Sequence, residues 1–217
     1  MLGHIKANPK RNICFDPHHP TINERSFSAY AWYDFYRDAK NSTLEDAPTP
    51  RGNVVSIYCF VNAYHSGDRS NRRSQTGVLI FLNKDPILWY INQQNTVKNS
   101  TFLSEFISFN IATKLVEDLW YKLQMFSIPI EGPSNMFCDN ESVYKNVSTP
   151  ESTLKKNNVS ICYHKCKEDV EDGLAQISKE GTSTNLSGLF TKILVKIRHE
   201  TLLDKFTYLF ICEVVFV

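Results

Sequence analysis

The chain has 217 residues, of which 42% are hydrophobic and 22% charged, and its formal net charge is +1. This composition can bury a core, which excludes wholesale disorder, and any binding to nucleic acid would need a local basic patch. The longest apolar run, Phe206 to Val217, is interrupted by Glu213 and is too short to span a bilayer, and the first residues show no signal peptide. Six scattered cysteines predict reduced thiols in an intracellular compartment.

The first part of the chain predicts a linker followed by an antiparallel meander. Residues 1–50 contain many aromatic side chains but are too few for a core of their own, and they end in a segment with two prolines that is followed by a glycine. Runs of β-branched and aromatic residues then predict three strands over 54–61, 77–82 and 87–91, with a polar loop over 62–75.

The second part predicts helices alternating with short strands. Apolar residues spaced three and four apart predict a long helix over 101–126, which Ser100 or Thr101 can cap. The elements expected after it are a strand over 135–139, a short helix from 140, a helix over 159–170, a strand over 174–178 and a last helix over 185–192.

Two carboxylates in this pattern are candidate functional groups. Glu105 is expected in the first turn of the long helix, on or beside its apolar stripe, where a carboxylate needs a cation, a metal or hydrogen-bond donors. The alternative is a favourable charge at a helix N-terminus. Asp139 ends an apolar strand, where α/β sheets often carry catalytic groups, or it caps the next helix together with Asn140. Both carboxylates in this order of elements indicate a metal-dependent nuclease of the ribonuclease H type.

A series of short strings carries a more specific signal. They are Phe60–Asp68, Arg72–Gly77, Pro86–Tyr90, Ser100–Phe106, Phe137–Ser142, Tyr163–His164, Asn185–Leu186 and Leu189–Lys192. In order and spacing this set resembles the ribonuclease H domain in Pol polyproteins of copia-type LTR retrotransposons. The resemblance implies an α/β, RNase H-like fold: a mixed five-stranded sheet, first an antiparallel meander and then parallel strands, flanked by helices. It implies an RNase H-like domain over 51–193, a remnant of the reverse-transcriptase connection over 1–50, and a C-terminal extension over 194–217.

The resemblance also implies a site. The family cleaves the RNA strand of RNA–DNA hybrids with four carboxylates around two Mg²⁺ ions. Glu105 and Asp139 fall on two of these positions and would be catalytic metal ligands, whereas the other two positions fall on Asn62 and Gly188. Since Mg²⁺ is held mainly by carboxylates, we expect weak or absent metal binding and little or no nuclease activity.

The expected binding partners are inferred from a basic loop and from the resemblance. Arg69, Arg72 and Arg73 follow the first strand and could contact the phosphates of an RNA–DNA hybrid, or they could form a solvated loop. The resemblance implies weak binding to a hybrid, an upstream reverse-transcriptase domain and a cytoplasmic location, and we expect no membrane partner. Two alternatives to an impaired nuclease are a non-catalytic nucleic-acid-binding module and a relic without function.

Two further segments have simpler interpretations. Cys162 and Cys166 share a helix face while His164 points away from it, so buried thiols are favoured over a zinc site. The apolar tail Phe206–Val217 is either an edge strand or sequence beyond the domain, and we expect it to promote aggregation where it is exposed.

Overall fold

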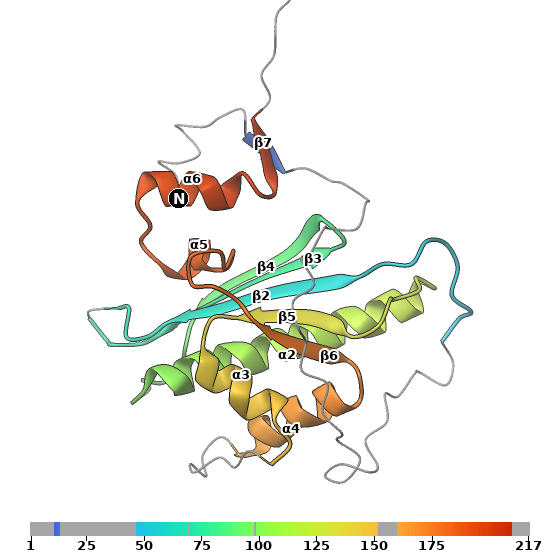
Figure 1. Ribbon diagram of the computed structural model, residues 1–217, viewed down its shortest axis with the longest axis horizontal. Coiled ribbons are helices and arrows are strands. Elements are labelled where there is room, and N and C mark those ends of the chain that lie inside the picture. Colours follow the sequence, from blue (N-terminus) through green and yellow to red (C-terminus); the bar gives the residue numbers. More distant parts are fainter. Residues whose placement is uncertain (1–10, 14–46, 69, 98, 152–159, 210–217) are drawn as a thin grey trace, which may run out of the picture.

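A mixed five-stranded sheet forms the centre of the molecule (Figure 1). The structure is a computed structural model, and it describes residues 11–13, 47–68, 70–97, 99–151 and 160–209. The strand order is β4-β3-β2-β5-β6. The antiparallel strands are β2 (Ile57–Tyr64), β3 (Gln75–Leu82) and β4 (Asp85–Gln93), and β5 (Ser134–Cys138) and β6 (Ala175–Lys179) add in parallel. The predicted α/β, RNase H-like fold is confirmed.

Helices cover both faces of this sheet (Figure 1). One face packs on α2 (Thr101–Met125), α3 (Glu141–Ser148) and α4 (Ser160–Glu171), and the other lies under α5 (Gly188–Thr191) and α6 (Lys196–Leu203). Side chains alternate along a strand, so Cys59 and Val61 of β2 face the three-helix side and Phe60 faces the other. Burial on both faces explains why β2 and β3 are almost continuously apolar.

Strand β2 lies three residues later than the sequence predicted, over 57–64 in place of 54–61. The polar loop was expected to begin at Asn62, but the ladder with β3 continues and pairs Asn62 with Gly77 and Tyr64 with Gln75. Asn62 is therefore a sheet residue with no exposed surface. The prediction was wrong because a polar side chain in a strand looks like a loop residue until its neighbours are known.

The end of the described chain also differs from the prediction. In place of a helix over 185–192, the chain forms the single turn α5, and α6, which was not predicted, follows it. Beyond α6, β7 (Thr207–Leu209) pairs antiparallel with β1 (Arg11–Ile13). The rest of the apolar tail lies outside the described residues. No helix in the described ranges is both long and apolar enough to cross a membrane.

Candidate active site

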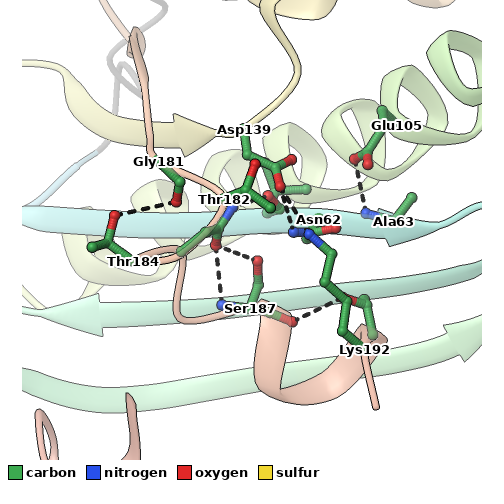
Figure 2. A network of polar contacts seen from close by, with 12 residues as sticks. Asn62, Ala63, Glu105, Asp139, Gly181, Thr182, Thr184, Ser187 and Lys192 are labelled. Carbon is green, nitrogen blue, oxygen red and sulfur yellow. Dashed lines mark hydrogen bonds and ion pairs between the residues drawn. The ribbon is translucent and has the colours of Figure 1, made fainter. Parts of the chain in front are cut away.

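Asn62 and Asp139 meet where the parallel pairing of β2 with β5 ends. The register places Val61 of β2 beside Cys138 of β5, so the next residue of each strand lies at the same end of the sheet. The Asn62 side chain is fully buried, and its Nδ2 donates a hydrogen bond to Asp139 Oδ2 at 3.1 Å (Figure 2). Two of the positions at which the family resemblance expects carboxylates are thus adjacent, but position 62 presents an amide N–H donor in place of a carboxylate.

Asn140, and not Asp139, caps helix α3. The Asn140 Oδ1 accepts hydrogen bonds from the backbone N–H groups of Ser142 and Val143. This is the N-cap geometry that satisfies the first N–H groups of a helix. The alternative interpretation, a cap formed by the Asp139–Asn140 pair, is confirmed for Asn140 and wrong for Asp139.

Glu105 reaches the site from helix α2. The helix begins at Thr101 with Ser100 as its cap, so Glu105 lies in the second turn and the first turn holds no acidic residue, contrary to the prediction. Glu105 is 8% exposed and accepts a hydrogen bond from the Ala63 N–H at 2.8 Å (Figure 2). Burial, and secondarily the negative charge of Asp139, raise the pKa of Glu105 to about 8. The expected desolvation is thus present, and it leaves this carboxyl mostly protonated at neutral pH.

Gly188, the fourth family position, begins α5. It follows Ser187, which belongs to the same polar network (Figure 2). A Cβ placed on Gly188 would have no atom within 4 Å, so the fold has room for a side chain here. The position is structurally able to carry a carboxylate, and this sequence does not supply one.

Glycine at position 77 lets α5 lie directly on strand β3. A Cβ on Gly77 would come within 2.6 Å of Thr191 Cγ2 and 3.1 Å of the Ser187 carbonyl oxygen. Next to this contact, Gln75 Nε2 donates a hydrogen bond to the Phe190 carbonyl at 3.1 Å. The short helix is therefore fixed to the sheet by close backbone approach and by a side-chain hydrogen bond.

Lys192 follows α5 and contacts the candidate site. Its Nζ lies 3.0 Å from Asp139 Oδ2, the same oxygen that accepts from Asn62 (Figure 2). The preceding loop is held by Asn185, whose Nδ2 donates to the Val61 carbonyl at 2.9 Å. Sequence reasoning missed this role of Lys192. Its string, Leu189–Lys192, entered the resemblance without any indication of an ion pair.

The basic loop lies beside a surface hollow. Arg72 and Arg73 are exposed, whereas Arg69 lies outside the described residues. Arg73 and Lys192 both line a hollow of about 420 Å³, together with Tyr64. Asp68 lines it too, and hydrogen bonds from Ser70 and Gln93 lower the pKa of Asp68 to about 2. The hollow therefore has two cations, one carboxylate and two aromatic residues, Tyr64 and Phe190, beside the candidate site.

The residues at the four family positions fit a pair of Mg²⁺ ions poorly. Asp139 Oδ2 already accepts from an amide and an ammonium, and position 188 has no side chain. Asn62 Oδ1 is buried without a hydrogen-bond partner, but it is a neutral oxygen. Over the described ranges, no cluster of three or more His, Cys, Asp or Glu residues is arranged to hold a metal.

The cysteines of helix α4 do not converge with His164. Cys166 is buried in the core and Cys162 is partly buried, whereas His164 is exposed. Burial raises the pKa of Cys166 to about 12. Cys166 therefore packs as a neutral group in the core, and Cys162 packs against the edge of that core.

Comparisons of sequence relate the chain to mobile-element polyproteins. No protein-family model matches it. It is 23% identical over 155 residues, 71% of its length, to the retrovirus-related Pol polyprotein from transposon RE1 of Arabidopsis thaliana. It is 25% identical over 142 residues, 65% of its length, to that from transposon TNT 1-94 of Nicotiana tabacum. The chain is a relative of retrotransposon Pol polyproteins. The matched region spans 11% and 10% of those two Pol polyproteins.

Solved structures similar to this Pol relative include RNase H domains. The N-terminal RNase H domain of a Mycobacterium tuberculosis protein has a TM-score of 0.47 and 10% identity, and the match covers 69% of this chain and 97% of that one. LC11-RNase H1, solved in complex with an RNA/DNA hybrid, has a TM-score of 0.46 and 13% identity, and the match covers 60% and 88%.

Proposed function

We propose that this ribonuclease H domain of retrotransposon Pol does not cleave RNA–DNA hybrids but still binds them. Relatedness to Pol polyproteins and the order of the mixed sheet support the domain assignment. Glu105 and Asp139 stand where the family resemblance expects two carboxylates. The other two expected carboxylates are replaced by Asn62 and Gly188.

The observation that carries the proposal is the hydrogen bond from Asn62 Nδ2 to Asp139 Oδ2. A carboxylate at position 62 would present anionic oxygens to a divalent ion, whereas this amide presents a donor to the neighbouring carboxylate. Mg²⁺ gives up its water reluctantly and is held mainly by carboxylates and substrate phosphates. Replacing two of four anionic groups therefore removes much of the charge that paired ions require, and hydrolysis that depends on both ions stops.

A cleavage assay tests this proposal. The full chain is incubated with a labelled RNA–DNA hybrid in Mg²⁺ or Mn²⁺, and we expect no cleaved product. The double variant Asn62→Asp/Gly188→Asp should regain cleavage, because position 188 has room for a side chain and both charges return. Each single variant should stay inactive. Adding Glu105→Gln to the double variant is the matched control and should abolish the regained activity. Cleavage by the unmodified chain that disappears in its own Glu105→Gln variant would overturn the proposal.

Hybrid binding without cleavage is supported by the hollow beside the site. Arg73, which is exposed, supplies positive charge there, and Tyr64, 40% exposed, supplies an aromatic face. Phosphate contacts make affinity fall steeply with salt, so gel shifts of the same hybrid at increasing salt measure this interaction. Salt-sensitive binding by the uncleaving chain supports a binding module. Lack of binding even at low salt favours the alternative of a relic without function.

The remaining assignments stay predictions drawn from the resemblance. They are the weakness of hybrid binding, an upstream reverse-transcriptase domain, a cytoplasmic location, and the division into residues 1–50, 51–193 and 194–217. Co-purification of this chain with a separately produced reverse-transcriptase domain would test the partner.

A further inference from the structure

The ion pair between Lys192 and Asp139 is more buried than a typical surface pair. The Lys192 Nζ lies 3.0 Å from Asp139 Oδ2, and the two side chains are 25% and 7% exposed. The pair between Lys179 and Glu141 has a similar separation of 2.8 Å, but its side chains are 51% and 52% exposed. Exposed pairs contribute little because water and salt screen them, whereas a nearly buried carboxylate depends on its partner.

The position of Lys192 is set by the fold. It follows α5, and α5 lies on β3 because Gly77 has no side chain to keep Thr191 and Ser187 away. The hydrogen bond from Gln75 to the Phe190 carbonyl fixes the same turn. The lysine thus directly follows a turn that is held against β3, next to the strand that carries Asn62.

Asp139 Oδ2 receives two donors. Lys192 supplies a full positive charge and Asn62 supplies an amide N–H at 3.1 Å. Together Lys192 and Asp139 sum to zero charge. A divalent ion at Asp139 Oδ2 would compete with both donors and would be repelled by the ammonium.

We propose that the Lys192 ammonium takes the place of a divalent cation at Asp139, so that this site is electrically balanced without metal. This inference rests on the proposed function, because it starts from a site in which two of the four family carboxylates are missing. It explains how the buried carboxylate of Asp139 is stabilised there. The residues do not fit a metal as they stand, and one reason, besides the two missing carboxylates, is a positive charge of the chain itself.

The experiment compares metal-dependent thermal stability in variants of the full chain. Unmodified protein should show no change in Tm with millimolar Mg²⁺ or Mn²⁺. Lys192→Met should lower Tm by about 5 °C or more, because Asp139 loses its counter-charge, and added Mn²⁺ should restore part of the loss. Lys179→Met, which removes the exposed pair, is the matched control and should change Tm little in either condition.

A second variant separates the ion-pair effect from general damage. Asp139→Asn/Lys192→Met has neither charge, so we expect its Tm to exceed that of Lys192→Met and to be insensitive to Mn²⁺. Electron paramagnetic resonance should detect bound Mn²⁺ in Lys192→Met and none in the double variant. Three outcomes would overturn the inference. They are a loss of Tm in Lys192→Met no larger than that in Lys179→Met, a stabilisation by Mn²⁺ that is equal in the double variant and in Lys192→Met, and binding of Mn²⁺ by the unmodified chain as tight as by Lys192→Met.

The two proposals fail in distinguishable ways. If the unmodified chain leaves the hybrid intact but Lys192→Met gains no metal response, Lys192 is not the substitute cation and the proposed function stands. If the unmodified chain cleaves the hybrid in Mg²⁺, the proposed function fails first.

Discussion

Glu105 combines a buried carboxyl with a single backbone donor. Its Oε2 accepts from the Ala63 N–H at 2.8 Å, which favours the ionised form, but burial and the neighbouring Asp139 outweigh this and raise the pKa of Glu105 to about 8. A proton is therefore bound in the folded state over a pH range in which the unfolded chain has released it.

This proton predicts a pH dependence of stability. Between the ordinary pKa of 4.5 and the folded value of about 8, folding takes up a proton, so the free energy of unfolding falls as pH rises and levels off above pH 8. Glu105→Gln keeps an acceptor for Ala63 and cannot ionise. We expect it to lose this fall and to be more stable than the unmodified chain at high pH, by on the order of a few kcal/mol.

Urea denaturation in EDTA at several pH values, from roughly pH 5 to pH 9, measures the effect. EDTA keeps traces of divalent metal from contributing. Equal pH slopes for the two proteins would show that Glu105 is ionised in the folded chain throughout this range.

The sequence predicted the two candidate carboxylates, Glu105 and Asp139, but not the groups that contact them. Glu105 was found because a carboxylate beside an apolar helix stripe is unusual, and Asp139 because it ends an apolar strand. The Lys192 contact joins residues 53 positions apart, through a loop whose path depends on tertiary packing. No local pattern around Lys192 distinguishes it from a solvated lysine.

Among the elements, the segment around α5 shows how side chains replace helical hydrogen bonds. Asn185 Oδ1 accepts from both the N–H and the hydroxyl of Ser187, at 3.1 Å and 2.6 Å. Asparagine and serine compete in this way with helix formation, so the predicted helix over 185–192 is reduced to one turn. The long helix and the strands other than β2 were predicted to within about two residues, because their apolar residues face the core directly.

The close contact of α5 with β3 predicts that Gly77→Ala is destabilising. The new methyl would lie 2.6 Å from Thr191 Cγ2 and 3.1 Å from the Ser187 carbonyl, and the second neighbour is backbone that cannot rotate away. We expect a loss of about 1–3 kcal/mol in the free energy of unfolding, typical of overpacking. Urea denaturation measures it.

Gly188→Ala is the matched control, because a Cβ there has no atom within 4 Å. We expect a change of at most about 0.5 kcal/mol in unfolding free energy, or a slight gain from replacing a helical glycine. Similar losses in both variants would mean that the glycine positions matter through backbone freedom and not through contact with α5.

Over the whole molecule, the second face of the sheet is closed by residues beyond the predicted domain end. Leu202 of α6 packs with Leu79 and Phe81 of β3, and the Phe206 ring meets the Phe81 ring edge-on at 6.0 Å. The sequence did not predict α6 because the burial of this helix rests on one residue, Leu202, whereas Ile197 on the same helix is 79% exposed. A sequence pattern shows which residues are apolar but not which of them meet the sheet.

This packing predicts that α6 contributes to the stability of the sheet. Leu202 is 2% exposed, so Leu202→Ala should lower the free energy of unfolding by about 2–4 kcal/mol through lost burial and the cavity it leaves. Ile197→Ala, on the same helix but 79% exposed, should change it by less than about 0.5 kcal/mol. Both are compared by urea denaturation of the full chain. If the two variants are equally stable, residues after 193 contribute nothing to the domain and its boundary falls where the sequence placed it. A large loss of stability in Leu202→Ala but not in Ile197→Ala would show that α6 unfolds together with the sheet. A cavity at residue 202 lowers the free energy of unfolding of the domain only if α6 belongs to the same cooperative unit.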